Sequence, residues 1–129
     1  MSKKERRAKG RKAESLFAKL VAGTYLQVDR NPPSIRAEEP VDVGNGKKKS
    51  VTHPDCVVRD PKFDREMFVE VTSGSGDNGH KKAQKKVADA AGVENYELVN
   101  GADLDELVEA SSPGNRLNLL LNWFNWDDD

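Results

Sequence analysis

Two short apolar segments joined by a turn constrain the fold of this chain more than any other feature. Residues 56–59 and 67–72 have the length and composition of β-strands, and the segment between them is rich in Asp and Pro. We therefore expect an antiparallel hairpin, which brings Asp55, just before the first strand, close to Glu70 on the second. Two carboxylates at one spot are what a divalent metal ion with hard oxygen ligands requires.

Length and composition restrict the class of protein. A chain of 129 residues predicts one domain, and 36% hydrophobic with 33% charged residues predicts a modest core. Cys56 is the only cysteine, which excludes an intramolecular disulfide and favours a reducing compartment. No segment has the ~20 apolar residues of a membrane span, and the basic N-terminus lacks the apolar stretch of a secretory signal. We expect a cytoplasmic protein without a membrane partner, although a toxin domain exported by another route would look the same.

The formal net charge of −1 conceals an uneven distribution. Residues 1–20 carry eight Lys or Arg against two Glu, whereas residues 101–129 carry seven acids against one Arg. We expect residues 1–12 to form a flexible basic arm, residues 13–126 a single domain and residues 127–129 an acidic tail. The arm is either a solubilising tail or a segment that contacts a polyanion.

The remaining elements follow from apolar spacing and from turn residues. Apolar residues at helical spacing predict a helix from Ala13 to about Gly23. Residues 31–49 form a long loop or a hairpin with a mobile tip. The other expected elements are a strand over 24–29, a helix over 79–92 with an apolar face of Ala83, Val87, Ala90 and Ala91, a strand over 95–101, a helix over 102–110 and a last helix from Ser112 or Pro113.

The last helix carries two apolar stripes, although one is enough for a core. The second consists of Leu119, Trp123 and Trp126. Tryptophans left in water would mark an interface, so a homodimer through this aromatic C-terminal helix is one expectation. In the alternative, the small core uses both stripes.

The order of these elements and a few residues within them resemble a known family. The resemblance consists of a first helix with Glu14, a strand, Pro-Asp at Asp55, Glu-x-x at Glu70 and a helix bearing lysine and glutamine. In these features the chain resembles the PD-(D/E)XK nuclease superfamily, in particular archaeal Holliday-junction resolvase-like members. The resemblance spans roughly residues 10 to 108. It implies an α/β fold with a restriction-endonuclease-like core (α-β-β-β-α-β), a mixed central sheet flanked by helices, and extra C-terminal helices.

The resemblance also implies a metal site. Asp55 and Glu70 would bind Mg²⁺ (or Mn²⁺), the carbonyl of Val71 would be a further oxygen ligand, and Glu14 would hold a metal-bound water. Two residues beyond the glutamate, the family has a lysine that steers the water and stabilises charge, but this chain has Thr72. A threonine contributes no positive charge.

Residues of the following helix are candidates to replace that lysine. Lys81 or Lys82 would supply the missing charge, and Gln84 matches a glutamine often found on this helix in the family. His80 at the helix start could be a base, a phosphate donor or an ordinary surface residue. The residues expected to contact nucleic acid are Lys3, Lys4, Arg6, Arg7, Lys9, Arg11, Lys12, Arg30, Lys47, Lys48, Lys49 and His80.

Each of these assignments has a structural alternative. Asp55 could simply be a turn residue, Glu70 a solvent-facing strand residue and Glu14 a solvated carboxylate. Lys81, Lys82, Lys85 and Lys86 could be a solvated helix face, and Cys56 is a core residue rather than a nucleophile.

We predict a metal-dependent endonuclease that hydrolyses phosphodiester bonds in DNA, including branched or structured DNA. The alternatives are a non-catalytic nucleic-acid-binding relative of the same fold, an RNA-cutting toxin domain, or a protein-interaction adaptor that uses the aromatic C-terminus.

Overall fold

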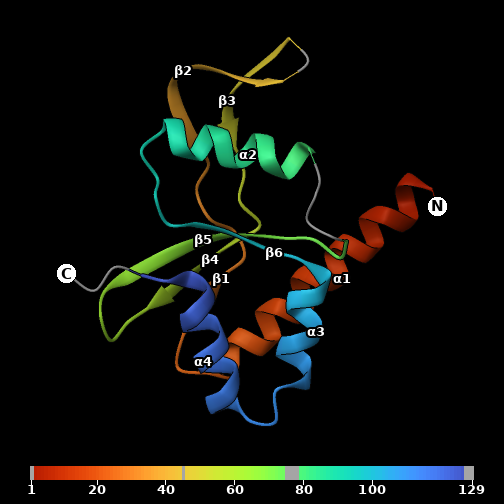
Figure 1. Ribbon diagram of the computed structural model, residues 1–129, viewed down its shortest axis with the longest axis vertical. Helices are drawn as coiled ribbons and strands as arrows, with labels where there is room; N and C mark the ends of the chain where they lie inside the picture. The colour runs from red at the N-terminus through yellow and green to blue at the C-terminus, as the bar shows by residue number, and fades with distance from the viewer. Residues whose placement is uncertain (1, 45, 75–78, 127–129) are drawn as a thin grey trace.

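The computed structural model describes residues 2–44, 46–74 and 79–126, without the side chains of Arg6, His80 and Lys81. In chain order, the elements are α1 (Lys3–Ala22), β1 (Gln27–Asp29), β2 (Ile35–Gly44), β3 (Lys47–Thr52), β4 (Cys56–Asp60), β5 (Arg65–Val71), α2 (Gly79–Ala90), β6 (Tyr96–Val99), α3 (Gly101–Glu109) and α4 (Pro113–Phe124). Helices α1, α3 and α4 cover one face of the main sheet, and α2 with the β2–β3 hairpin lies on the other (Figure 1). No helix in these ranges is long and apolar enough to cross a membrane.

The main sheet is mixed. Its strand order is β1-β4-β5-β6, in which β4 pairs antiparallel with both β1 and β5, while β5 and β6 are parallel. Helix α2 makes the crossover between the two parallel strands. Apart from the inserted β2–β3 hairpin, the order is α-β-β-β-α-β followed by two helices. The predicted mixed sheet flanked by helices is therefore confirmed.

Side chains of β5 alternate between the two faces, as period two predicts. Met67, Val69 and Val71 belong to a large apolar cluster with α1, α3 and α4. Phe68 packs instead against a small cluster of Ile35, Ala88 and Tyr96 on the α2 side of the sheet. Glu70 lies on the same side as Phe68 and is therefore held away from the main core.

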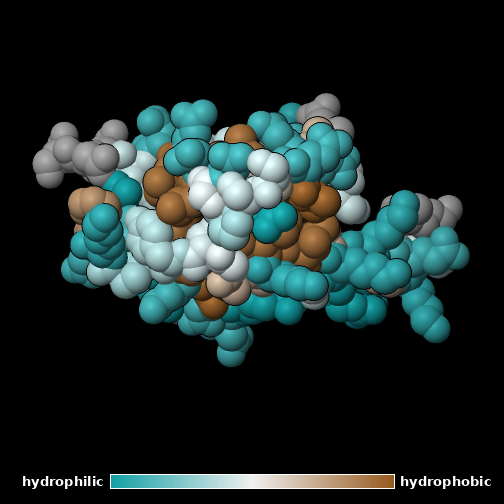
Figure 2. Space-filling view, turned by 90° about the horizontal axis from the view of Figure 1, so that it is seen from below, coloured by the Kyte–Doolittle hydropathy of each residue, from teal (hydrophilic) through white to brown (hydrophobic). Residues whose placement is uncertain are grey.

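The basic N-terminal segment is helical, so the expected start at Ala13 was too late. The side chain of Ser2 caps α1 by accepting a hydrogen bond from the amide of Glu5 at 3.1 Å. Lys, Arg and Ala are strong helix formers, and no proline interrupts them. Because this half of α1 has no apolar stripe, apolar periodicity could not detect it. It projects from the body as a hydrophilic extension (Figures 1 and 2).

The segment 31–49 contributes to a hairpin, one of the two alternatives that its composition allowed. Strands β2 and β3 form a separate two-stranded sheet that packs on α2. This contact rotates the buried face of α2: Gln84 and Ala88 are buried, whereas Ala90, expected on the apolar face, is exposed. The expected apolar face was wrong at Ala90 because α2 packs against the hairpin as well as against the main sheet.

The aromatic stripe of the C-terminus is part of the core and does not form an exposed patch. Trp126 is 8% exposed, and Trp123 packs partly buried against the same cluster. The surface below α1, α3 and α4 shows brown patches separated by white and teal residues (Figure 2). The small core thus uses both stripes, which removes the argument that predicted a dimer through this helix.

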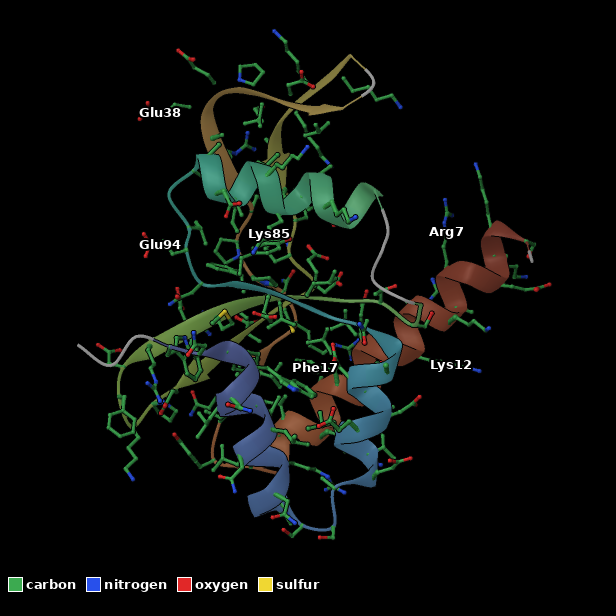
Figure 3. All side chains as sticks on the ribbon, viewed as in Figure 1. Arg7, Lys12, Phe17, Glu38, Lys85 and Glu94 are labelled. Carbon is green, nitrogen blue, oxygen red and sulfur yellow. The ribbon has the colours of Figure 1, made fainter. Side chains whose placement is uncertain are left out.

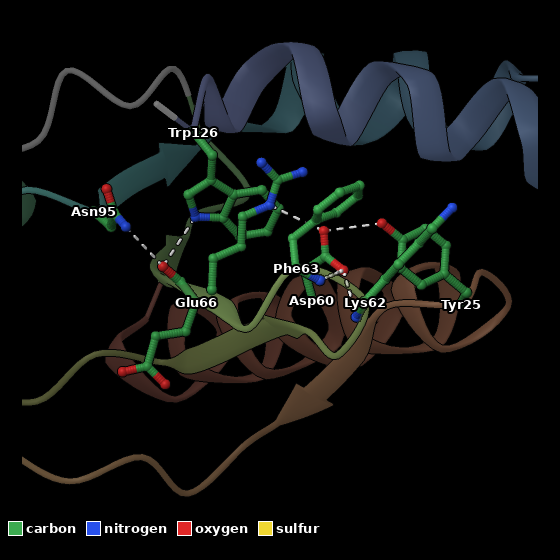
Figure 4. Close-up of polar contacts among 8 residues, drawn as sticks. Tyr25, Asp60, Lys62, Phe63, Glu66, Asn95 and Trp126 are labelled. Atoms are coloured by element: carbon green, nitrogen blue, oxygen red, sulfur yellow. Dashed lines mark hydrogen bonds and ion pairs between the residues drawn. The ribbon is translucent and has the colours of Figure 1, made fainter. Parts of the chain in front are cut away.

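Trp126 is anchored at the turn between β4 and β5 (Figure 4). Its indole N–H donates to the carbonyl of Glu66 at 3.0 Å, and its ring stacks under the guanidinium of Arg65 at 4.5 Å. Arg65 in turn pairs with Asp60 at 3.0 Å. The C-terminal segment therefore locks the same turn that joins the two central strands.

Asp60 organises this turn. Its carboxylate accepts hydrogen bonds from Tyr25, from Arg65 and from the amides of Lys62 and Phe63. Burial by itself would raise the pKa of Asp60, but these donors outweigh burial and lower the pKa. The contribution of Asp60 to stability is therefore present above the pKa of an unfolded aspartate and is lost as the pH falls through the lowered value.

The anchoring of Trp126 generates a stability prediction. Trp126→Ala should lower the free energy of unfolding by about 3–5 kcal/mol, because it removes a large buried ring and its hydrogen bond. Urea unfolding followed by circular dichroism measures this. Val108→Ala is the control, since Val108 is 47% exposed and its loss should change stability by less than about 0.5 kcal/mol. Equal small effects of the two variants would contradict the assigned role of Trp126.

Candidate functional site

Asp55 and Glu70 come together where β4 begins and β5 ends. The backbone register pairs Cys56 with Val69, so Asp55 lies opposite Glu70, one step beyond the last pair. The amide of Val71 donates to Oδ2 of Asp55 at 2.7 Å, which holds the Asp55 side chain against the end of β5. Two carboxylates are thereby brought together at one end of the two central strands.

Glu70 is fully buried and is held from a third strand. The phenol of Tyr96, on β6, donates to Oε1 of Glu70 at 2.7 Å. Burial, then the charge of Glu70 and the hydrogen bond to it, strongly raise the pKa of Tyr96. The Thr52 hydroxyl also lies near the phenol, where it lowers this pKa, but the two groups do not form a well-aligned hydrogen bond. Glu70 is therefore not the solvent-facing strand residue of the simplest alternative.

The pKa of the Cys56 thiol reflects the negative charges of nearby carboxylates. Burial first, and then the negative charges of Asp55, Glu14 and Glu70, raise the pKa of Cys56 from 9.0 to about 12, while Arg30 acts in the opposite direction. Three carboxylates from α1, β5 and the start of β4 thus act on one buried atom. Cys56 is a core residue, as expected, and is not an activated nucleophile.

The donor set suits a hard cation with few protein ligands. Within residues 2–44, 46–74 and 79–126, no three His, Cys, Asp or Glu side chains are grouped so that they could hold a metal ion. Magnesium is ordinarily held by one or two carboxylates together with waters and substrate phosphates. Asp55 and Glu70 fit that pattern, and the role of the Val71 carbonyl as a ligand stays a prediction. Glu14 does not complete a group of three side chains, and its role in holding a water remains a prediction.

Thr72, at the position where the resemblance to the nucleases implies a lysine, has a structural task. Its hydroxyl accepts the amide of Gly74 at 3.3 Å and so forms part of the turn that follows β5. Among the candidates on α2, Lys82 is exposed and Gln84 is 6% exposed, with no hydrogen-bond partner for its Oε1 among the described residues. The side chains of His80 and Lys81 lie outside the described residues, so their roles stay predictions.

A cleft of about 520 Å³ opens between α1, the segment that follows β5, and α3. The described residues that line it are Lys9, Lys12, Ala13, Leu16, Ser73, Gly74, Gly101, Ala102, Leu104 and Asp105. The amide of Gly101 donates to the carbonyl of Gly74 at 2.9 Å, and a Cβ at Gly101 would clash with the Ser73 carbonyl. Glycine at the start of α3 thus lets the segment after β5 lie directly against the helix.

The predicted nucleic-acid contacts divide into separate regions. Arg7 and Lys12 lie on the projecting part of α1, whereas Phe17 points into the core (Figure 3). The described basic side chains on this part of the helix are all exposed: Lys3, Lys4, Arg7, Lys9, Arg11 and Lys12. Lys47, Lys48 and Lys49 lie on β3 in the separate hairpin. Of the predicted contacts whose side chains the structure describes, Lys9 and Lys12 line the cleft between α1 and α3.

Two residues have a larger part in the site than the sequence suggested. Tyr96 had no signal beyond its place in a strand, because its contact with Glu70 depends on the β5–β6 register. Arg30 was expected to contact nucleic acid, but its charge also acts on Cys56, and its guanidinium donates to Ser15 on α1 at 3.1 Å. Arg30 directly follows β1, an edge strand, and nothing in the sequence indicates that its side chain turns toward α1 and Cys56.

Comparison with protein-family models, with curated proteins and with solved structures finds no match to this chain. A functional assignment therefore rests on the fold and on the geometry of the carboxylates.

The environment of Cys56 predicts an inert thiol. At pH 8 the folded protein should react with a disulfide reagent roughly 1,000-fold more slowly than a thiol with the ordinary pKa, because the thiolate is the reacting form. Absorbance of the released chromophore measures the rate, and the single cysteine makes the signal unambiguous. Protein unfolded in urea is the control and should react at the ordinary rate. Rapid labelling of the folded protein would contradict the described burial.

Proposed function

We propose that the chain is a divalent-metal-dependent endonuclease that hydrolyses phosphodiester bonds in DNA. One observation carries the proposal: the Val71 amide holds Asp55 at the position opposite Glu70, on the neighbouring strand. The α-β-β-β-α-β order around a mixed sheet supports it, because this is the core that the resemblance to PD-(D/E)XK nucleases implies.

The proposed roles follow from the chemistry of each residue. A bound Mg²⁺ or Mn²⁺ would neutralise the scissile phosphate and activate a water. Asp55 and Glu70 provide the hard oxygen ligands, and their strands keep them rigid. Lys9 and Lys12, at the cleft, attract the phosphate backbone. The basic residues of the N-terminal half of α1 extend that contact along the nucleic acid, since this half of the helix projects from the body of the protein (Figure 1).

The first experiment tests the paired carboxylates. Asp55→Asn and Glu70→Gln each retain an acceptor for the observed hydrogen bond but lose the charge, so the fold is preserved. Each should lower Mg²⁺-dependent nicking of supercoiled DNA by about 100-fold or more, since metal binding supplies several kcal/mol of stabilisation. Glu38→Gln, at an exposed position of β2, is the control and should cut normally. Undiminished cleavage by both site variants would refute the proposed site.

A second experiment asks which cation replaces the family lysine. Arg30 is a candidate because its charge acts on the Cys56 thiol, as do the charges of the carboxylates. Lys81 and Lys82 are the candidates that the sequence predicts. Alanine at the correct residue should lower the cleavage rate about 100-fold, with little change in DNA binding. Lys85→Ala is the matched control, because Lys85 is exposed further along α2. Equal small losses in all four variants would mean that these residues only attract the phosphate backbone.

Nucleic-acid binding without cleavage is the second candidate function. The engagement of Thr72 in the turn with Gly74 favours it, because the position of the family lysine then serves the backbone. A wild-type protein that binds DNA with strong salt dependence, but cuts neither DNA nor RNA with any divalent ion, would establish this alternative. Cleavage of RNA alone would favour the toxin-like reading.

A further inference from the structure

The proposed function assigns a role to Glu70 but none to Tyr96, which donates a hydrogen bond to it. Tyr96 lies on β6, in parallel register with Phe68 of β5, so its side chain shares the α2 face of the sheet with Glu70. Its ring is 3% exposed and packs in the small cluster with Ile35 and Ala88. The phenol is thus fixed by packing before it donates to Glu70 at 2.7 Å.

We propose that Tyr96 is a positioning residue that holds the Glu70 carboxylate in the orientation needed to bind a divalent cation. This inference rests on the proposed metal site and adds to it a residue that does not itself touch metal or substrate. A protonated phenol is an O–H donor with only one hydrogen to give, and here the hydrogen goes to Oε1 of Glu70. Outer partners of this kind fix the geometry of metal-ligating carboxylates.

Two further observations support a positioning role. A glutamate side chain has several rotatable bonds, so the position of its backbone does not fix the direction of its carboxylate oxygens. A hydrogen bond to the carboxylate itself, such as the one from Tyr96, fixes that direction. Asp55 has the same kind of fixation through the Val71 amide. Each of the two carboxylates therefore accepts a hydrogen bond from a neutral donor of the protein, and this contact helps to orient its oxygens.

The chain also contains a matched control for this contact. Tyr25 donates to the buried carboxylate of Asp60 at 2.9 Å, at the turn between β4 and β5. Both contacts are hydrogen bonds from a phenol to a buried carboxylate, and Phe at either position removes only one hydroxyl. The Asp60 contact belongs to the turn, not to the candidate site.

The test measures Mn²⁺ binding to the DNA-free protein by electron paramagnetic resonance, so that it does not depend on activity. Tyr96→Phe should weaken Mn²⁺ binding by about 10- to 100-fold, the range typical for the loss of an outer partner. Tyr25→Phe should leave Mn²⁺ affinity unchanged, although both variants should lower the melting temperature. The double variant Glu70→Gln with Tyr96→Phe should bind no more weakly than Glu70→Gln alone, because Tyr96 acts through Glu70.

The outcomes separate the inference from the function on which it rests. If wild-type protein binds Mn²⁺ and cuts DNA while Tyr96→Phe binds equally well, the positioning role is wrong and the nuclease proposal stands. If Tyr25→Phe loses as much affinity as Tyr96→Phe, the effect is one of general stability and the inference fails. If wild-type protein neither binds Mn²⁺ nor cuts, both proposals fail together.

Discussion

The register between β4 and β5 is the constraint on which the other features depend. It pairs Cys56 with Val69 and so sets Asp55 opposite Glu70. A slip of one residue would turn every side chain of β5 to the other face, placing Glu70 in the apolar core. The turn between β4 and β5 fixes this register. Asp60 accepts hydrogen bonds there from a backbone amide of the turn and from Arg65, and Trp126, near the C-terminal end of the sequence, packs on Arg65. The C-terminus thus helps to determine the geometry of the carboxylates.

Three carboxylates, those of Asp60, Asp55 and Glu70, show how differently the same chemical group can be used. Asp60 receives an arginine and two backbone amides besides a tyrosine, which keeps its pKa low and makes it a structural lock. At Asp55 and Glu70, the hydrogen bonds described above come from neutral groups, and the two acids act with Glu14 on the same thiol. Strongly perturbed groups of this kind cluster at functional sites, and they also occur in structural ion-pair networks.

Much of the fold could be predicted from the sequence because the central strands have strong local signals. The alternation of β5 and the Asp-rich turn gave both strands and the pairing of Asp55 with Glu70. The contact between Tyr96 and Glu70 could not be predicted, since it depends on a parallel pairing across a helical crossover. The burial of Gln84 was missed because the hairpin packs on α2, and the start of α1 because charged residues carry no apolar period. The first two outcomes depended on tertiary contacts, whereas the start of α1 depended on helix propensity together with the Ser2 cap.

The apolar clusters on the two faces of the sheet are very unequal, and this has a consequence for motion. The cluster with α1, α3 and α4 contains most of the buried side chains, whereas the cluster under α2 consists of Ile35, Ala88 and Tyr96 with a few partly buried neighbours. Free energies of local opening follow the apolar contacts that each region would lose. Helix α2 and its hairpin can therefore separate from the sheet at a smaller cost than global unfolding. Amide hydrogens of α2 would then exchange with solvent before those of β4 and β5, on the very face that carries Glu70.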